Sequence, residues 1–274
     1  MKRYISVLFL SIAALGLLFI YQSFSLSDGR LHMVVCDIGQ GDGIYIRADN
    51  GADLIVDGGP DNRILDCLSK HMPFWDRTIE VMILTNPDAD HLRGVTHIID
   101  SYKVIHYATV DFPKQTAAYK LLQSKLRQKN ITTEYYFSGE KIIFGKTEFS
   151  FLWPDKSFNG GTVNDNSVVG RLTFGNFSAL LTGDVGANIL DTQKIGKVNV
   201  LKVPHHGSKT GMSDIFLNET MPNLAIISVG KHNNYGHPAS LSLELLKKHN
   251  VKTLRTDLNG EVEVVSDGNS YWVN

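Results

Sequence analysis

The stretch Val81-Met-Ile-Leu-Thr-Asn-Pro-Asp-Ala-Asp-His-Leu-Arg-Gly94 decides how the rest of this chain is interpreted. Its first four residues are apolar and rich in strand formers, which predicts a buried strand. Asp88, Asp90 and His91 follow within four positions. Carboxylate oxygens and an imidazole nitrogen on a loop held by a buried strand are suitable ligands for a divalent metal ion. Taken alone, the stretch is also compatible with a solvated turn, where Asp and Pro are common.

The same pattern recurs at four other apolar stretches, each of which leads into a residue with metal-binding or catalytic capability. Residues 54–56 lead to Asp57, residues 180–181 to Asp184, residues 198–203 to His205 and His206, and residues 226–229 to His237. Strand ends in open α/β sheets meet at one edge, where functional sites are built. We therefore expect these side chains to share a metal site.

The periodicity along the chain predicts an α/β fold. Strands are expected at 31–38, 44–48, 54–57, 81–84, 104–110, 141–144, 147–153, 167–174, 178–184, 198–203 and 224–229, with an alternating tail. Helices are expected at 63–71, 95–101, 116–129, 186–194, 213–219 and 241–249. This order favours one domain in which two sheets pack together with helices outside.

The N-terminus has the features of an export or anchoring segment. Lys2 and Arg3 precede a run of mostly apolar residues at 4–20. A membrane span needs roughly 17–25 such residues. We expect residues 1–26 to be an uncleaved anchor in the cytoplasmic membrane, with a cleaved signal as the alternative. The positive flank would stay in the cytoplasm, which places the domain at 27–274 outside it.

Charge and cysteine content narrow the function further. The net charge is −1 over 274 residues, and residues 1–30 carry +2, so the remainder is about −3. Any binding of nucleic acid would thus depend on a local basic patch. Cys36 and Cys67 are too few for a disulfide scaffold, although they could pair outside the cytoplasm. Because Cys36 lies in an apolar run, a buried free thiol is expected.

Seven motifs in order give the chain a family resemblance from residue 31 to about residue 260. It resembles the metallo-β-lactamase fold, an αββα sandwich of two mixed sheets, and within it the hydrolase domain of the ComEC/Rec2 family of DNA-uptake proteins. The motifs are Asp37-Ile-Gly-Gln-Gly-Asp42, Val56-Asp-Gly-Gly59, Asp88-Ala-Asp-His91, Asn164-Asp-Asn-Ser167, Leu181-Thr-Gly-Asp184, Val203-Pro-His-His-Gly-Ser208 and Tyr235-Gly-His-Pro238. Those proteins carry many membrane spans, so this chain is expected to be a stand-alone anchored or secreted relative.

The resemblance implies a role for each site residue. Metal binding is expected of Asp88, Asp90, His91, Asp184 and His205, with Asp184 bridging two ions. Catalysis is expected of Asp90, His206 and His237, where the two imidazoles bind phosphate or act as general acid. Asn166, Ser167 and Ser208 are expected to donate hydrogen bonds to substrate phosphate. Asp57 and Asn86 are expected to support the ligands from behind.

One position departs from the family pattern. The metal loop of the family usually opens with His, whereas this chain has Asn86. A carboxamide is a weaker, neutral ligand, so the first metal site becomes rich in oxygen and suits Mn²⁺ or Mg²⁺ better than Zn²⁺. The prediction is one tight site and one weak or empty site, holding one or two ions of Mn²⁺ or Zn²⁺, with Mg²⁺ as a further candidate.

The remaining chemical side chains are expected outside the site. His32, His71, His97, His106, His232 and His249 lack acidic neighbours in a motif, so surface or core positions are expected. Tyr135-Tyr-Phe137 is expected to pack in a strand rather than to stack on bases. Lys202 and Lys209 either meet phosphate or lie on a solvated face.

Three functions are weighed from these features. The first is a metal-dependent phosphodiesterase, expected to be an extracytoplasmic nuclease whose partner is DNA. The second is a hydrolase of a small ester or lactam, because one fold hosts many reactions. The third is a non-catalytic module that binds DNA or a protein partner, with Asn86 marking a partly decayed metal site.

Overall fold

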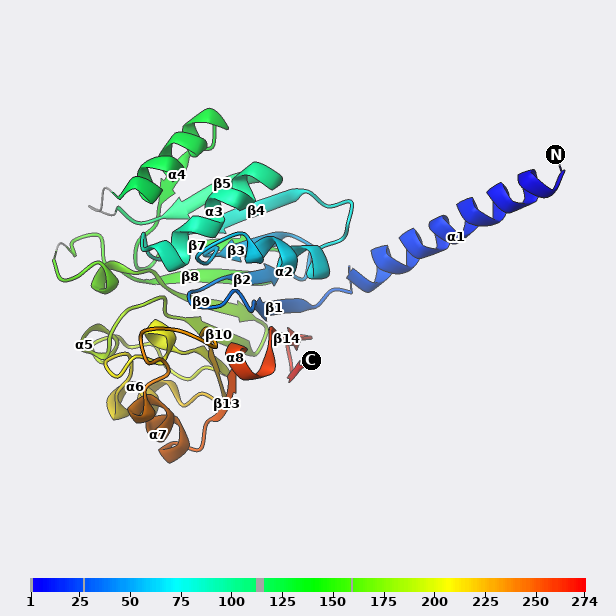
Figure 1. Cartoon of the computed structure of the whole chain (residues 1–274). Helices are drawn as coiled ribbons and strands as arrows, with labels where there is room; N and C mark the ends of the chain where they lie inside the picture. The colour runs from blue at the N-terminus through cyan, green and yellow to red at the C-terminus, as the bar shows by residue number, and fades with distance from the viewer. Residues whose placement is uncertain (1, 27, 112–115, 159) are drawn as a thin grey trace.

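The computed structural model describes residues 2–26, 28–111, 116–158 and 160–274. Ser27, at the expected start of the domain, lies outside these residues. The described strands form two sheets that face each other (Figure 1). The larger sheet has the order β15-β14-β1-β2-β3-β4-β5-β6. Its strands are β1 Leu31–Val35, β2 Ile44–Arg47, β3 Asp53–Val56, β4 Thr78–Ile83, β5 Lys103–Thr109, β6 Thr133–Tyr135, β14 Val262–Ser266 and β15 Tyr271–Val273.

The second sheet has the order β13-β12-β11-β10-β9-β8-β7. Its strands are β7 Lys141–Phe144, β8 Thr147–Trp153, β9 Val169–Phe174, β10 Phe177–Leu181, β11 Val200–Lys202, β12 Leu224–Ile227 and β13 Lys252–Arg255. Both sheets are mixed: β3 to β6 and β10 to β13 run parallel, whereas β1 with β2 and β7 with β8 pair antiparallel. This confirms the expected αββα sandwich.

Helices cover the outer faces of the two sheets. In Figure 1, α2 Arg63–His71, α3 Ala89–Ser101 and α4 Ala117–Gln128 lie on one side, and α5 Ala187–Leu190, α6 Asp214–Thr220 and α7 Ser240–Lys248 lie on the other. A further turn of helix, α8 Thr256–Asn259, and two 3₁₀ turns, η1 Asn164–Asn166 and η2 Pro204–Gly207, complete the described elements. Helix α4 corresponds to the helix predicted at 116–129, and it buries one stripe of side chains, Tyr119, Leu122 and Leu126.

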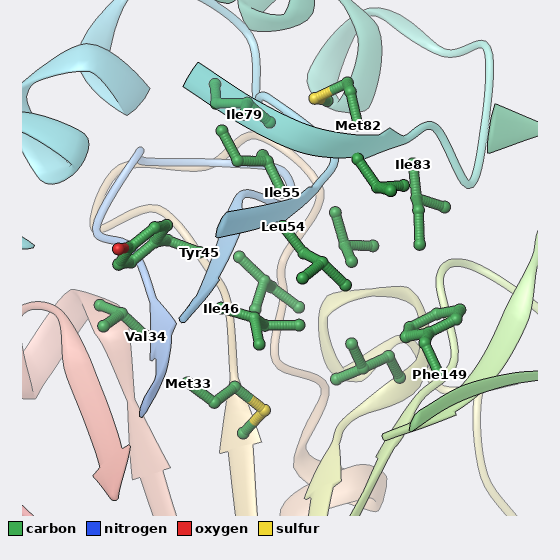
Figure 2. Close-up of a cluster of buried hydrophobic side chains, with 14 of the residues drawn as sticks. Met33, Val34, Tyr45, Ile46, Leu54, Ile55, Ile79, Met82, Ile83 and Phe149 are labelled. Atoms are coloured by element: carbon green, nitrogen blue, oxygen red, sulfur yellow. The ribbon is translucent and has the colours of Figure 1, made fainter. Parts of the chain in front are cut away.

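The core between the sheets follows from strand alternation. Met33, Ile46 and Leu54 are in register across β1, β2 and β3, so their side chains share one face. Figure 2 shows this face directed toward Phe149 of β8 in the opposite sheet. A Cβ atom at Gly170 on β9 would lie 2.1 Å from the Phe149 ring, so the glycine leaves the space that the ring fills. These contacts fix how the two sheets meet.

Two helix predictions were wrong in their bounds. Helix α3 begins at Ala89 rather than at residue 95, with Asp88 in extended backbone before it. Asp90 and His91 therefore lie in the first turn of a helix, not on a loop. Helix α5 spans only Ala187–Leu190, because polar residues follow where the apolar stripe would have to continue.

The prediction of a free thiol at Cys36 was also wrong. Cys36 and Cys67 form a disulfide with a Cα–Cα distance of 5.9 Å, although 31 residues separate them in the sequence. Helix α2 carries Cys67 to the end of β1, a juxtaposition that the apolar run around Cys36 does not reveal. Among the described residues no free cysteine remains.

The N-terminal helix α1 Lys2–Leu26 extends away from the two sheets in Figure 1. Its apolar side chains between Tyr4 and Tyr21 are largely exposed wherever the structure describes them. Within the described part of the chain, no helix combines enough length with enough apolar character to cross a membrane.

Candidate metal centre

The candidate centre lies where strands of both sheets end. Asp57 follows β3, Asp90 and His91 follow β4, Asp184 follows β10, and His206 lies in η2 after β11. Because β3 with β4, and β10 with β11, run parallel, their carboxyl ends reach the same edge of each sheet. The topology therefore gathers the acidic and imidazole side chains that the sequence left far apart.

Four of these side chains form a cluster that we call the aspartate–histidine cluster: Asp90, His91, Asp184 and His206. His91 Nε2 lies 3.2 Å from Asp184 Oδ2, and His206 Nε2 lies 3.6 Å from Asp184 Oδ1 and 3.5 Å from Asp90 Oδ2. Ligand atoms of Asp90, His91 and His206 all lie within 4.8 Å of one another. One cation could therefore contact several members.

Close backbone contacts set the position of α3. A Cβ atom at Gly94 would lie 1.7 Å from the carbonyl oxygen of Gly58, so the helix can approach the loop after β3 only because this residue is glycine. The Gly58 N–H donates to the carbonyl of His91 at 2.8 Å, and the Gly94 N–H donates to Gly59 at 2.9 Å. This packing holds His91 against Asp57.

Asp57 orients the His91 ring. His91 Nδ1 lies 2.8 Å from Asp57 Oδ2, which also accepts a hydrogen bond from the Thr85 hydroxyl at 2.5 Å. The Thr85 N–H donates to Asp57 Oδ1 at 2.7 Å. A carboxylate on one ring nitrogen leaves the other nitrogen directed at the cluster, as is usual behind metal-binding histidines.

A buried ion pair stands behind His206. Lys202 Nζ contacts Asp42 Oδ2, and both residues are almost fully buried. His206 Nδ1 lies 3.4 Å from Asp42 Oδ1 and 2.9 Å from the carbonyl of Ser228. Both expectations for Lys202, phosphate contact and a solvated face, were wrong, because its ammonium is enclosed beneath the site.

Three site residues have backbones in the left-handed region, with φ of 61° at Asp57, 47° at His205 and 53° at His206. Residues other than glycine adopt this conformation at a cost of about 1–3 kcal/mol, and such strain concentrates at functional sites. The strained turn after β11 directs the His206 side chain into the cluster and leaves the His205 side chain partly exposed.

The electrostatics of the cluster favour a cation. Burial lowers the pKa of His206, but the carboxylates of Asp184 and Asp42 outweigh this effect and raise it to about 9. Burial also lowers the pKa of His91, but the carboxylates of Asp184 and Asp57 outweigh this effect and raise the pKa well above its usual value. Burial raises the pKa of Asp42, yet Lys202 and His206 bring it to about 2. Positive charge at this point is thus stabilised.

The donor atoms also pass a direct test of fit for a divalent metal. His91 Nε2, His206 Nε2 and Asp184 Oδ1 are buried and have no hydrogen-bond partner in the described structure. Buried polar atoms normally have partners, and these three atoms converge on one point, so they form a donor set that a divalent ion would satisfy. Two imidazole nitrogens with carboxylate oxygens form a ligand set that Zn²⁺ and Mn²⁺ accept.

Asn86 uses its whole side chain within the protein. Its Oδ1 accepts the Asp88 N–H at 2.8 Å, and its Nδ2 donates to Asn164 Oδ1 at 3.0 Å and to Ser167 Oγ at 2.9 Å. The carboxamide is fully buried. Asn86 therefore connects the loop before α3 to η1 and supports Asp88.

A pocket of about 600 Å³ opens over the cluster. Six expected site residues line it, namely Asp88, Asp90, Asp184, His205, His206 and His237. Ser167 is buried beneath it as the partner of Asn86. Asn166 donates to the carbonyls of Gly160 and Thr162 and lines a different hollow. Ser208 lies outside the lining and contacts Thr210.

The positions of His205 and His206 do not match the roles that were expected of them. His206 points its Nε2 into the cluster, whereas His205 Nε2 is 3.8 Å from Asp184 Oδ2 and its side chain is 28% exposed. Burial lowers the pKa of His205. By geometry His206 is the better placed ligand, and His205 faces the space above it.

Several residues at the site were not predicted from the sequence. Asp42 lies under the cluster, and Gln40, Arg63, Arg93 and Tyr235 line the pocket. Gln40, Asp42 and Tyr235 stand in two of the motifs that carry the family resemblance, which is the signal that could have found them. The arginines stand in no such motif.

The side chains expected outside the site do lie elsewhere where the structure describes contacts. His32, His71, His106 and His249 each pair with a carboxylate away from the pocket. Tyr136 stacks on Phe151 of β8 at 4.6 Å between ring centroids, so it packs against the sheet as expected.

Comparison with known proteins agrees with this geometry. The model of the metallo-beta-lactamase superfamily matches residues 36–232, and the chain belongs to that superfamily. It is thus a metal-dependent hydrolase by family, as the resemblance predicted, and its fold implies divalent metal ions.

Within the superfamily the chain is similar to competence proteins. It is 32% identical to ComE operon protein 3 of Bacillus subtilis over 90% of this chain and 34% of that protein. It is 28% identical to Recombination protein 2 of Haemophilus influenzae over 83% of this chain and 28% of that one. The chain therefore spans about a third of the length of these relatives.

Solved structures share the fold at low identity. The metallo-beta-lactamase fold protein YhfI from Bacillus subtilis has a TM-score of 0.57 and 13% identity, covering 89% of this chain and 100% of its own. Zn²⁺-bound PqqB from Methylobacterium extorquens has a TM-score of 0.51 and 12% identity, covering 86% and 99%.

Proposed function

We propose that this protein hydrolyses phosphodiester bonds and that its substrate is DNA. One observation carries the proposal: three members of the aspartate–histidine cluster line a pocket together with two arginines, Arg63 and Arg93. The cluster suits a cation that faces a scissile phosphate, and guanidinium groups suit the flanking phosphates. A neutral ester or lactam would leave Arg93 without a partner.

The relatives support DNA as the substrate. One similar protein is named Competence protein ComA, from Neisseria gonorrhoeae, and another is named Recombination protein 2. Arg93 adds local support, because it is exposed at the pocket and the described residues provide no ion pair for it. Arg63 is held by Asp61 at 2.8 Å, which keeps its guanidinium in place.

The acidic and imidazole residues of the site then each have a proposed task. Asp90, His91, Asp184 and His206 would hold a divalent ion, for which we propose Mn²⁺ or Zn²⁺, with Mg²⁺ as a further candidate. Such an ion polarises a phosphate and lowers the pKa of an attacking water. Asp88 and His205 face the same pocket and would complete a weaker second site.

His237 is proposed to move the proton. Burial, and then the neighbouring His205 and His206, lower its pKa, so its imidazole is neutral near pH 7. Asn233 fixes its backbone through hydrogen bonds of 3.0 Å and 2.7 Å, and the Tyr235 ring stacks on it at 5.9 Å between centroids. A neutral imidazole at the pocket can accept a proton or donate one hydrogen bond to phosphate.

We further propose that the domain works outside the cytoplasm, anchored through residues 1–26 or secreted after their removal. The Cys36–Cys67 disulfide supports this location, because disulfides persist in oxidising compartments. Protease accessibility in intact and lysed spheroplasts tests it: digestion only after lysis contradicts the proposal.

The test of function uses the purified chain with Mn²⁺, Zn²⁺ or Mg²⁺ added separately. Substrates are single-stranded DNA, duplex DNA, bis-p-nitrophenyl phosphate and nitrocefin. We expect cleavage of DNA and of the phosphodiester, abolished by Asp90→Asn and retained by Asp100→Asn at the other end of α3. Turnover of nitrocefin alone, or DNA binding without cleavage under any metal, would overturn the proposal.

A further inference from the structure

A second group of metal-binding side chains lies outside the pocket. Cys67, His71 and Glu261 each place one ligand atom within 4.8 Å of the other two. His71 Nε2 is 3.4 Å from Glu261 Oε1, yet it is buried without a hydrogen-bond partner in the described structure. None of these residues lines the pocket over the aspartate–histidine cluster.

Three elements bring the group together. Cys67 and His71 stand four residues apart on α2, so they share one face of the helix. Glu261 lies between α8 and β14, and Lys70 Nζ contacts its Oε2 at 3.1 Å. Cys36, just after β1, reaches the same point because its sulfur is bonded to that of Cys67.

The group has the composition of a zinc site that the disulfide keeps closed. A thiolate is a strong metal ligand, whereas a sulfur in a disulfide is not deprotonated and binds poorly. Breaking the Cys36–Cys67 bond would yield two thiols beside an imidazole and a carboxylate. Two sulfurs, one nitrogen and one oxygen make the four ligands of a closed tetrahedral site.

We propose that the reduced chain binds one Zn²⁺ through Cys36, Cys67, His71 and Glu261. An external dithiol supplies two electrons and two protons, is itself oxidised to a disulfide, and leaves two protein thiols. Zinc binding then releases both thiol protons. Two thiolates and one carboxylate carry a charge of −3, and Lys70 beside the carboxylate contributes +1. The remaining charge of −2 is neutralised by the ion. The ion would join the end of β1, helix α2 and the segment between α8 and β14, the first two of which the disulfide already links.

This site is independent of the proposed hydrolase activity and predicts two exclusive states. In a reducing compartment the chain would be held by zinc, and in an oxidising one by the disulfide. Cys36 and Cys67 are 0% and 3% exposed, so neither thiol is open to bulk solvent once the chain has folded. Zinc captured during synthesis would therefore protect both thiols until oxidation.

Cobalt provides the readout, since thiolate ligands give Co²⁺ an intense near-ultraviolet charge-transfer band that nitrogen and oxygen ligands lack. The full chain is titrated anaerobically with Co²⁺, once oxidised and once reduced with a phosphine. We expect the band only after reduction, together with one more metal per chain than in the oxidised form. A folded reduced chain without the band overturns the proposal. If reduction unfolds the chain, zinc must restore its circular dichroism, and failure to do so also overturns it.

Variants locate the site. Replacing even a residue behind a metal ligand costs about 10–100-fold in affinity, so His71→Gln should weaken cobalt binding to the reduced chain at least as much. Glu261→Gln should act in the same direction. The control is His249→Gln, whose imidazole also contacts a carboxylate, Asp214 at 2.8 Å, but no cysteine. Wild-type affinity in His71→Gln would show that the two thiols bind metal without this site.

Discussion

His91 Nδ1 lies 2.8 Å from Asp57 Oδ2, although 34 residues separate the two in the sequence. The contact joins the loop after β3 to the first turn of α3, and it directs His91 Nε2 at Asp184. Asp57 is itself held by two hydrogen bonds from Thr85. The metal centre therefore depends on a buried carboxylate that would not itself touch the ion.

Asp57→Asn tests this dependence. A carboxamide can still accept a hydrogen bond from His91, but it lacks the charge that makes the ring a better ligand. We expect metal affinity to fall by about 10–100-fold while the fold is retained. Competition with a chromophoric chelator measures the change in metal affinity. The variant His91→Ala, which lacks the ligand itself, sets the lowest affinity expected. An unchanged affinity would show that Asp57 serves only the fold.

Lys202→Met is expected to destabilise the protein strongly. The substitution leaves the Asp42 carboxylate buried without its partner, which typically costs about 3–5 kcal/mol. Urea unfolding of the metal-free protein measures the loss. The double variant Asp42→Asn, Lys202→Met removes both charges, and it should recover more than half of the lost stability. If the double variant is as unstable as the single one, packing and not charge explains the loss.

The pair of His32 and Glu263 should stabilise the protein only over part of the pH range. Burial lowers the pKa of His32, but its contacts with Glu263 and Asp28 raise it above 6.5, while the hydrogen bond from His32 lowers the pKa of Glu263. The histidine contribution is complete below pH 6.5 and is lost as pH rises through the raised value. The glutamate contribution is present above pH 4.5 and is lost as pH falls through the lowered value.

His32→Gln should therefore lower the free energy of unfolding by about 1 kcal/mol at pH 5–6. The difference from wild type should shrink as the pH rises through the raised pKa of His32. Thermal unfolding of both proteins between pH 5 and pH 9 measures it, with the exposed His97→Gln as the control. A difference that is the same at every pH would contradict the ionic origin.

Gly94→Ala tests the close approach of α3 to the loop after β3. The added Cβ would lie 1.7 Å from the Gly58 carbonyl oxygen, so the helix must move. We expect a loss of about 1–3 kcal/mol and weaker metal binding, because the helix carries Asp90 and His91. Gly160→Ala is the matched control, since its Cβ meets nothing within 4 Å. Equal stability in the two variants would refute the steric argument.

Arg93→Ala tests the basic lining of the pocket. Loss of a charge-assisted hydrogen bond to phosphate should raise KM for bis-p-nitrophenyl phosphate roughly tenfold, with kcat less affected. The KM of the wild type should rise with salt, and that of the variant should rise less. Arg127→Ala on α4, outside the pocket, is the control. An unchanged KM would remove Arg93 from the proposed substrate site.

The regular elements were predictable because their signals are local. Helix α2 spans Arg63–His71 as its spacing predicted, and β7 and β8 have the predicted bounds. Helix α3 was predicted to start too late, because the polar residues at its N-terminus carry no apolar stripe. The site residues were predictable as a group, since apolar strands that end in Asp and His share a sheet edge.

The fold class, most of the strand and helix order and the gathering of Asp90, His91, Asp184 and one of the histidines at 205–206 were predictable from the sequence alone. Three further contacts became known only from the folded chain: His206 enters the cluster, Lys202 is buried against Asp42, and Cys36 is bonded to Cys67. Periodicity and motifs report the surroundings of a residue along the chain. These three contacts depend instead on backbone turns and on packing between segments that are distant in the sequence.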